Sequence, residues 1–222
     1  MTEIDLFGVK ILEPIVVLTD IIVTIVCIWA FINLRKLDQG SAARKMMGWY
    51  IIVSGVSTTV GGLLGHGLIY MSDFVTMKFP GWILGMIGTH FFQKAALYNA
   101  EPVLQATTFK RLDLLISMLT AIGIGVLFYF KTFIIVEIYL GVGHLLIAMP
   151  LFIYYLNKSS DEASRLALIG IAVLASSLLV VIPKLSIGAW ISHHDIAHII
   201  MAISIYMSYL AGRAMHRAGA IV

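Results

Sequence analysis

The stretch Ile11–Leu34, ILEPIVVLTDIIVTIVCIWAFINL, is almost entirely apolar. A helix of roughly 20 apolar residues crosses the hydrocarbon core of a bilayer, because each residue adds about 1.5 Å along the axis. The stretch therefore predicts a membrane-spanning helix. Its two acids, Glu13 and Asp20, are seven residues apart and share one helix face. Since an ionisable group inside a membrane is costly, this face marks a candidate functional site.

The rest of the 222-residue chain has the same apolar character. It is 60% hydrophobic and 12% charged, with a mean hydropathy of +0.97. Soluble domains are about 25% charged, so the composition excludes an ordinary soluble domain. The length leaves no room for a separate catalytic domain. We predict an all-α, integral membrane, seven-transmembrane-helix bundle that forms a single domain over residues 1–222, with spans at 11–34, 46–70, 81–98, 112–130, 133–156, 166–182 and 189–212.

Lysine and arginine are unevenly distributed between the two sides of this predicted bundle. Retained cytoplasmic loops are enriched in both residues, so the richer side predicts the cytoplasm. The amino terminus is then outside and the carboxyl terminus cytoplasmic. Ten basic residues lie on the cytoplasmic side and four on the other, namely Arg35, Lys36, Arg44, Lys45, Lys110, Arg111, Lys158, Arg165, Arg213 and Arg217 against Lys10, Lys78, Lys131 and Lys184.

These features also bear on partners and location. Basic residues in short loops favour lipid head groups as partners, and no nucleic-acid signature is present. Extensive hydrophobicity with short loops favours a bacterial inner (plasma) membrane. The sequence predicts no particular oligomeric state.

The strongest chemical signal is the stretch Ser192–His198, SHHDIAH. His194 and His198 are one helical turn apart, so both imidazoles point the same way. Two such histidines can bind one metal ion with a third ligand from elsewhere, which leaves a position open for water. This spacing indicates a metal or haem ligand role for His194 and His198. Interhelical hydrogen bonding is the alternative reading of the same histidines.

Other polar side chains in the spans are candidates for catalysis. His90, Asp195 and Asp20 each have the chemistry of a general base or of a group that orients a ligand imidazole. His66 is surrounded by glycines, which equally fits a close-packed helix seam. The catalytic prediction is therefore His90, Asp195 and Asp20 around the metal.

The placement of these residues resembles the CREST membrane hydrolase superfamily, which contains the alkaline ceramidases, the progestin and adipoQ receptors and haemolysin III-like proteins. In that superfamily a Ser-x-x-x-His in the second helix and a His-x-x-x-His in the seventh belong to a zinc site. His66 matches the first motif and His194–His198 the second, but the serine position is Gly62. The resemblance implies a zinc site formed by His66, His194 and His198. The family's Asp near the second or third helix has only Asp73 as a counterpart.

Three function classes follow. The first is a zinc-dependent intramembrane hydrolase that acts on a lipid amide or ester, with membrane lipid as substrate or ligand. The second is a protein that binds haem b or another redox cofactor by bis-histidine ligation, with neighbouring glycines giving room for the macrocycle. The third is a non-enzymatic receptor or proton-relay transporter. Candidate haem ligands are His66, His90, His144 and His198.

Overall fold

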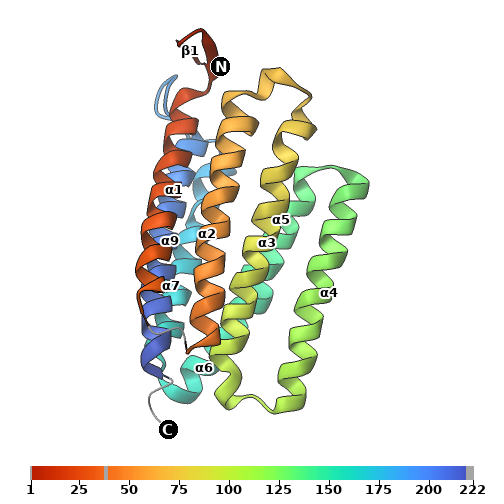
Figure 1. Ribbon diagram of the computed structural model, residues 1–222, viewed down its shortest axis with the longest axis vertical. Coiled ribbons are helices and arrows are strands. Elements are labelled where there is room, and N and C mark those ends of the chain that lie inside the picture. Colours follow the sequence, from red (N-terminus) through yellow and green to blue (C-terminus); the bar gives the residue numbers. More distant parts are fainter. Residues whose placement is uncertain (1, 38–39, 219–222) are drawn as a thin grey trace.

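A computed structural model describes residues 2–37 and 40–218 of the chain, and side chains as far as residue 215. Its helices lie side by side along one long axis, and the two termini are at opposite ends (Figure 1). Arg217, which contributed to the predicted charge asymmetry, has its side chain outside this described part. The helical prediction is thus confirmed along almost the whole chain.

The described residues form nine α-helices, two of which are joined by a π-helical turn. Their bounds are α1 Pro14–Arg35, α2 Ala42–Gly62, α3 Phe74–Ala100, α4 Ala106–Phe130, α5 Phe133–Gly141, α6 Met149–Ser159, α7 Glu162–Ser176, α8 Leu178–Val181 and α9 His193–Ala218. The π-helical turns are η1, Leu63–Gly67, which continues α2, and η4, Val142–Ala148, which connects α5 to α6. Short 3-10 turns, η2 (Ile69–Met71) and η3 (Glu101–Val103), flank α3.

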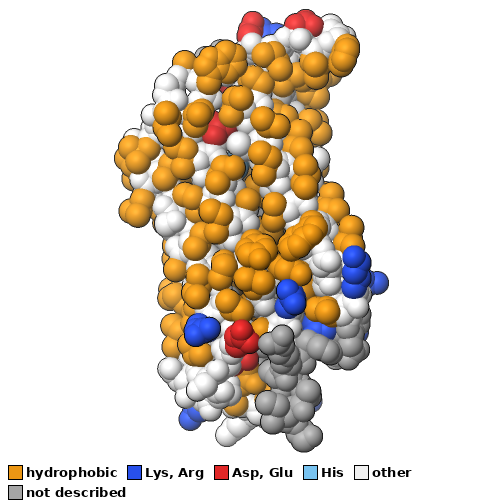
Figure 2. All heavy atoms as spheres, turned by 90° about the vertical axis from the view of Figure 1, so that its left-hand side faces the viewer, with side chains coloured by type: hydrophobic (Ala, Val, Ile, Leu, Met, Phe, Trp, Pro, Cys, Tyr) orange, Lys and Arg blue, Asp and Glu red, His pale blue; other side chains and the backbone are white. Residues whose placement is uncertain are grey.

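Six helical segments in the described part of the chain are long and apolar enough to cross a membrane, which indicates a membrane protein. Helix α3 is the exception among the long helices. It is 27 residues long, but its polar side chains, such as His90, Gln93 and Lys94, make it less apolar than the other six. Figure 2 shows the apolar surface of one face between two ends that carry charge. The six segments are Pro14–Arg35, Ala42–Gly67, Ala106–Phe130, Phe133–Ser159, Glu162–Val181 and His193–Met215.

The amino-terminal segment forms a structure that the hydropathy pattern did not predict. Strands β1 (Glu3–Leu6) and β2 (Val9–Leu12) pair as an antiparallel hairpin. Both turn residues have positive φ, 54° at Phe7 and 81° at Gly8, as a tight two-residue hairpin turn requires. The first helix consequently begins at Pro14 rather than at Ile11. Proline suits the first helical turn because its missing N–H would have no partner there.

The last helix also begins later than predicted, at His193 instead of position 189. Before it, Ile187 and Ile191 form an isolated antiparallel bridge. Asp195 then reaches back to Ser192, accepting hydrogen bonds from its backbone N–H at 2.6 Å and from its hydroxyl at 2.7 Å. An acid at this position accepts a hydrogen bond from a donor at the helix start, and its negative charge interacts favourably with the positive end of the helix dipole.

Three helices pack closely enough to form one site at the end of the bundle that holds the amino terminus. Helix α9 packs against α1, α2 and α7, and α1 also packs against α2. Gly55 permits the α1–α2 approach, because a Cβ there would lie 2.6 Å from the Cβ of Cys27. The ends of α1, α2 and α9 near the amino terminus are therefore neighbours.

The α3–α4 contact is polar and lies deeper in the bundle. The Lys94 ammonium on α3 forms a 2.6 Å ion pair with Asp113 on α4 and donates to the Ser117 hydroxyl at 2.9 Å. The lysine that interrupts the third apolar run thus has a fixed ionic partner, which lowers the cost of placing it inside the bundle.

Candidate functional site

Histidines from two helices and an aspartate from a third meet at the amino-terminal end of the bundle. The ring centres of His66 and His194 are 5.5 Å apart. The Nε2 atom of His198 lies 3.5 Å from Oδ1 of Asp20. Residues from three distant parts of the sequence thereby lie near one another, and we call them the histidine cluster: Asp20, His66, His194 and His198.

His66 is positioned by the π-helical turn η1 at the end of α2. The turn adds one residue per hydrogen-bonded ring, seen in the 2.8 Å bond from the N–H of Leu68 to the carbonyl of Leu63, and so changes the direction in which the following side chains point. His66 Nδ1 forms a 2.6 Å hydrogen bond with Oε2 of Glu13. That bond to His66 lowers the pKa of Glu13, which lies just outside the first membrane segment. Because this bond engages Nδ1, the other ring nitrogen, Nε2, is the one available to bind a ligand.

His198 is held in a similar way from the α1 side. Its Nδ1 forms a 3.0 Å hydrogen bond with the hydroxyl of Thr19, and that hydroxyl lies 3.4 Å from Oδ1 of Asp195. Since Asp195 also accepts two bonds from Ser192, both of its oxygens are engaged. Asp195 therefore acts as a positioning residue: it caps the start of α9 and contacts Thr19, the residue that bonds His198.

Asp20 is the least satisfied member of the histidine cluster. Its side chain is buried at 3% exposure, and Oδ2 has no hydrogen-bond partner among the described residues. The carboxylate lies against Gly62, where an added Cβ would be 2.6 Å from Oδ2. Gly62 occupies the position at which the CREST-like motif has serine. The Asp20 carboxylate thus fills the space beside His66 that a side chain at position 62 would need.

Sequence reasoning missed two side chains next to this cluster. One is Thr19, an ordinary helix residue by hydropathy. The other is Lys78 on α3, which a charge count assigns to an external loop, although it lies close enough to act electrostatically on Glu13 and Asp20. Gly65 gives it room, because a Cβ there would be 3.0 Å from Cγ of Lys78. The pairing of helices, which hydropathy does not encode, was needed to find both.

Residues 15–217 match the Family of unknown function (DUF6962). The chain belongs to DUF6962. No curated protein and no solved structure has significant similarity to the chain. The function of this DUF6962 protein must therefore be argued from the site itself.

The remaining predicted histidines of the DUF6962 protein have other neighbours. His90 faces α4, where Nδ1 forms a 2.8 Å hydrogen bond with Thr120, whose hydroxyl also bonds the Tyr139 hydroxyl at 2.7 Å. His144, on η4, stacks on Phe92 and forms a bond from Nδ1 to the carbonyl of Leu140. The structure therefore brings together Asp20, His66, His194, His198 and Asp195, and it places His90 on the α3–α4 side.

The donor types of the histidine cluster fit a divalent metal ion. His66 and His198 both have Nδ1 engaged by an oxygen, the arrangement that orients a histidine to bind metal through Nε2. An additional carboxylate oxygen, Oδ2 of Asp20, is buried without a partner. As the side chains stand, no group of three or more His, Cys, Asp or Glu residues within 2–37 and 40–215 has the geometry of a metal site. The histidine cluster thus has the donor atoms that a divalent metal ion requires, but its side chains are not in a metal-binding geometry.

Proposed function

We propose that this DUF6962 protein is a zinc-dependent intramembrane hydrolase that acts on a lipid amide or ester. The observation that carries the proposal is that His66 lies beside His194, while His198, one turn further along α9, lies 3.5 Å from the buried Asp20 carboxylate. The CREST-like spacing of the same three histidines supports it. In the bacterial inner membrane that we propose as its location, with the amino terminus outside, the site faces the outer leaflet.

Each residue of the histidine cluster has a distinct role in this proposal. The three histidines would hold zinc, which when bound acts as a Lewis acid and lowers the pKa of a bound water towards 7. With His198 binding through Nε2, its Nδ1–H donates to the Thr19 hydroxyl, which donates in turn to the Val16 carbonyl at 2.9 Å and lies 3.4 Å from Oδ1 of Asp195. Glu13 plays the equivalent part for His66. These oxygens fix the imidazole tautomers before any substrate arrives.

Asp20 is the group best placed to accept a proton. Its Oδ2 is buried and without a partner, whereas both oxygens of Asp195 are engaged. A carboxylate used in this way takes the proton of the attacking water and returns it to the leaving group. Lys78 supplies the positive charge on the α3 side, where negative charge on the carbonyl oxygen would develop.

The lipid nature of the substrate is supported by an apolar hollow between α1 and α9. It has a volume of about 480 Å³. Ile22 lies two residues beyond Asp20, and Ile199 follows His198 directly, so the hollow begins at the same depth along the bundle as the histidine cluster. The hollow runs along one side of α1 and of α9 as far as the stacked rings of Trp29 and Tyr206. An acyl chain entering from the membrane would lie there with its carbonyl end towards the cluster.

Metal analysis of the purified full-length protein tests this function. We expect one zinc per chain in the wild type and less than about one-tenth of that in His194→Ala and His198→Ala. His90→Gln is the matched control, because His90 faces α4, and it should retain the metal. The proposal fails if the wild type contains no stoichiometric zinc or if the control loses zinc equally. A haem absorption spectrum would favour the redox alternative.

Activity is measured on the same preparations with a fluorescent ceramide and a matched fluorescent ester. Release of the labelled acyl group should stop in Asp20→Asn while zinc is retained. Retained zinc without hydrolysis of either lipid would leave the metal site intact and overturn the hydrolase assignment.

A further inference from the structure

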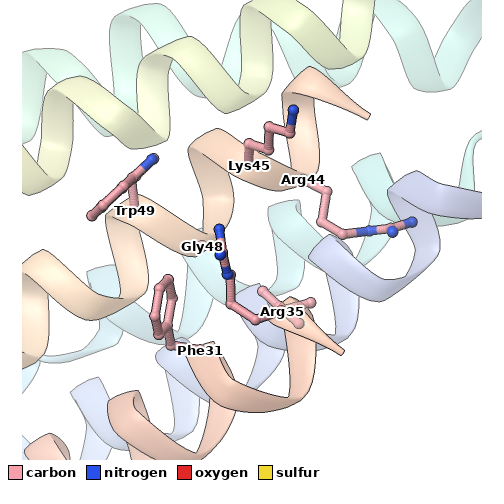
Figure 3. A pocket seen from close by; sticks show the side chains of 7 residues that line it. Phe31, Arg35, Arg44, Lys45, Gly48 and Trp49 are labelled. Atoms are coloured by element: carbon pink, nitrogen blue, oxygen red, sulfur yellow. The ribbon is translucent and has the colours of Figure 1, made fainter. Parts of the chain in front are cut away.

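A second pocket lies at the opposite end of the bundle, where α1 ends and α2 begins (Figure 3). It is a cavity of about 60 Å³. By the same measure, one water needs roughly 10–15 Å³, so the space holds a group of several heavy atoms. Its wall includes Phe31, Arg35, Arg44, Lys45, Gly48 and Trp49.

The lining of this pocket is strongly basic. Of the described residues that line it, three are cationic and none is acidic. Arg44 is buried at 1% exposure and its Nε donates to the carbonyl of Gly212 at 3.2 Å, so this charge is fixed in place. Arg35 and Lys45 are exposed and come from different helices. The arrangement combines one immobile charge with two that are free to close on a ligand.

The pocket also has the features of a membrane–water interface. Figure 3 shows Arg35 reaching from α1 towards Gly48 of α2, with Phe31 and Trp49 to one side. Trp49 is 47% exposed, and an exposed tryptophan near a helix end is typical of the head-group region. Its ring forms aromatic contacts with Phe31 and with Phe91 of α3. A ligand held by the cations would therefore contact an apolar wall on its membrane side.

We propose that this pocket binds the phosphate group of an anionic phospholipid. Arg35 and Lys45 contact the phosphate oxygens, Arg44 supplies the fixed charge behind them, and Trp49 packs against the glycerol and upper acyl region. Basic pockets between helices recognise anionic head groups in this way, with each cation near the surface contributing a factor of about five in affinity. The site is independent of the histidine cluster, which lies at the other end of the bundle.

Native mass spectrometry of the full-length protein tests the proposal with phosphatidylglycerol and phosphatidylcholine of identical acyl chains. We expect one phosphatidylglycerol retained in preference to phosphatidylcholine. Arg35→Gln and Lys45→Gln should each weaken that preference about fivefold. Lys36→Gln is the matched control, because it removes the same charge from the residue that directly follows α1 and does not line the pocket, and it should leave the preference unchanged.

A second measurement locates the bound lipid even if one variant folds poorly. Brominated phosphatidylglycerol in vesicles should quench the tryptophan fluorescence of the wild type more than brominated phosphatidylcholine does, and Trp49→Phe should remove that difference. Equal binding of both lipids, equal loss in Lys36→Gln, or displacement of the lipid by millimolar inorganic phosphate would overturn the proposal. Displacement by phosphate would identify a free-anion site.

Discussion

Two adjacent glycines, Gly61 and Gly62, have opposite surroundings although hydropathy does not distinguish them. A Cβ on Gly62 would be 2.7 Å from the Cβ of Asp20, whereas a Cβ on Gly61 would meet nothing within 4 Å. The absence of a side chain at Gly62 is thus what admits the Asp20 carboxylate into the histidine cluster. A side chain on Gly61 would face open space, so nothing in its surroundings requires glycine there.

This contrast predicts different outcomes for the same substitution at neighbouring positions. Gly62→Ala forces Asp20 or the α1–α2 packing to shift, so we expect a loss of about 1–3 kcal/mol in the free energy of unfolding and reduced zinc content. Gly61→Ala should leave both unchanged or raise the stability slightly. Thermal unfolding in detergent and metal analysis measure the two effects. Equal behaviour of the two variants would contradict the placement of Asp20.

Helix α7 depends on a buried cap that also ties it to α3. Asp161 is 7% exposed and accepts hydrogen bonds from the backbone N–H of Ser164 at 2.7 Å and from the amide of Asn99 at 2.9 Å. Asp73 caps α3 in the same way through the N–H of Thr76, but it is exposed to solvent. The two aspartates therefore perform one local function in different environments.

We expect Asp161→Ala to lower the free energy of unfolding by about 1–3 kcal/mol, because it removes a cap and leaves the Asn99 amide buried without this acceptor. Asp73→Ala should lower it less, since water replaces the lost acceptor. Thermal or denaturant unfolding of the two variants in the same detergent makes the comparison. A larger loss in Asp73→Ala would refute the importance of the α3–α7 link.

The Asp73 cap also has a defined pH dependence. Hydrogen bonds from Thr76 lower the pKa of Asp73 below its ordinary 3.8. Its stabilising effect is therefore present above pH 3.8 and is lost as the pH falls through the lowered value. The stability difference between wild type and Asp73→Ala should accordingly disappear at strongly acidic pH.

The orientation of the whole bundle can be tested because its single cysteine is hidden. Cys27 has 0% exposure, so it should not react with a membrane-impermeant maleimide. The loop at Lys131 lies at the amino-terminal end of the bundle and Lys110 at the other, and both residues are exposed. The distribution of basic residues predicts that Lys131 is outside the cell.

We therefore expect Lys131→Cys to be labelled in intact cells and Lys110→Cys only after the membrane is opened. The wild type is the control for reaction at Cys27. Labelling of Lys110→Cys alone in intact cells would reverse the orientation, and with it the leaflet assigned to each of the two sites.

Most helices were predictable because the signals that form them are local. Apolar runs located the long helices, and the i, i+4 spacing placed His194 and His198 on one face of a helix. The hairpin before Pro14 and the late start of α9 were missed because turn geometry and capping override hydropathy at the ends of a run. The π-helical turn that positions His66 has no hydropathy signal.

The amino-acid sequence was sufficient to predict a helical membrane protein with an unusual concentration of histidines and acids. Composition and periodicity carry that information, since both reflect the burial of individual residues. The meeting of Asp20 with His198, and of His66 with His194, required the folded molecule. A periodic pattern defines the face of one helix, whereas the faces that meet depend on the close approach of α1 to α2 and of both to α9.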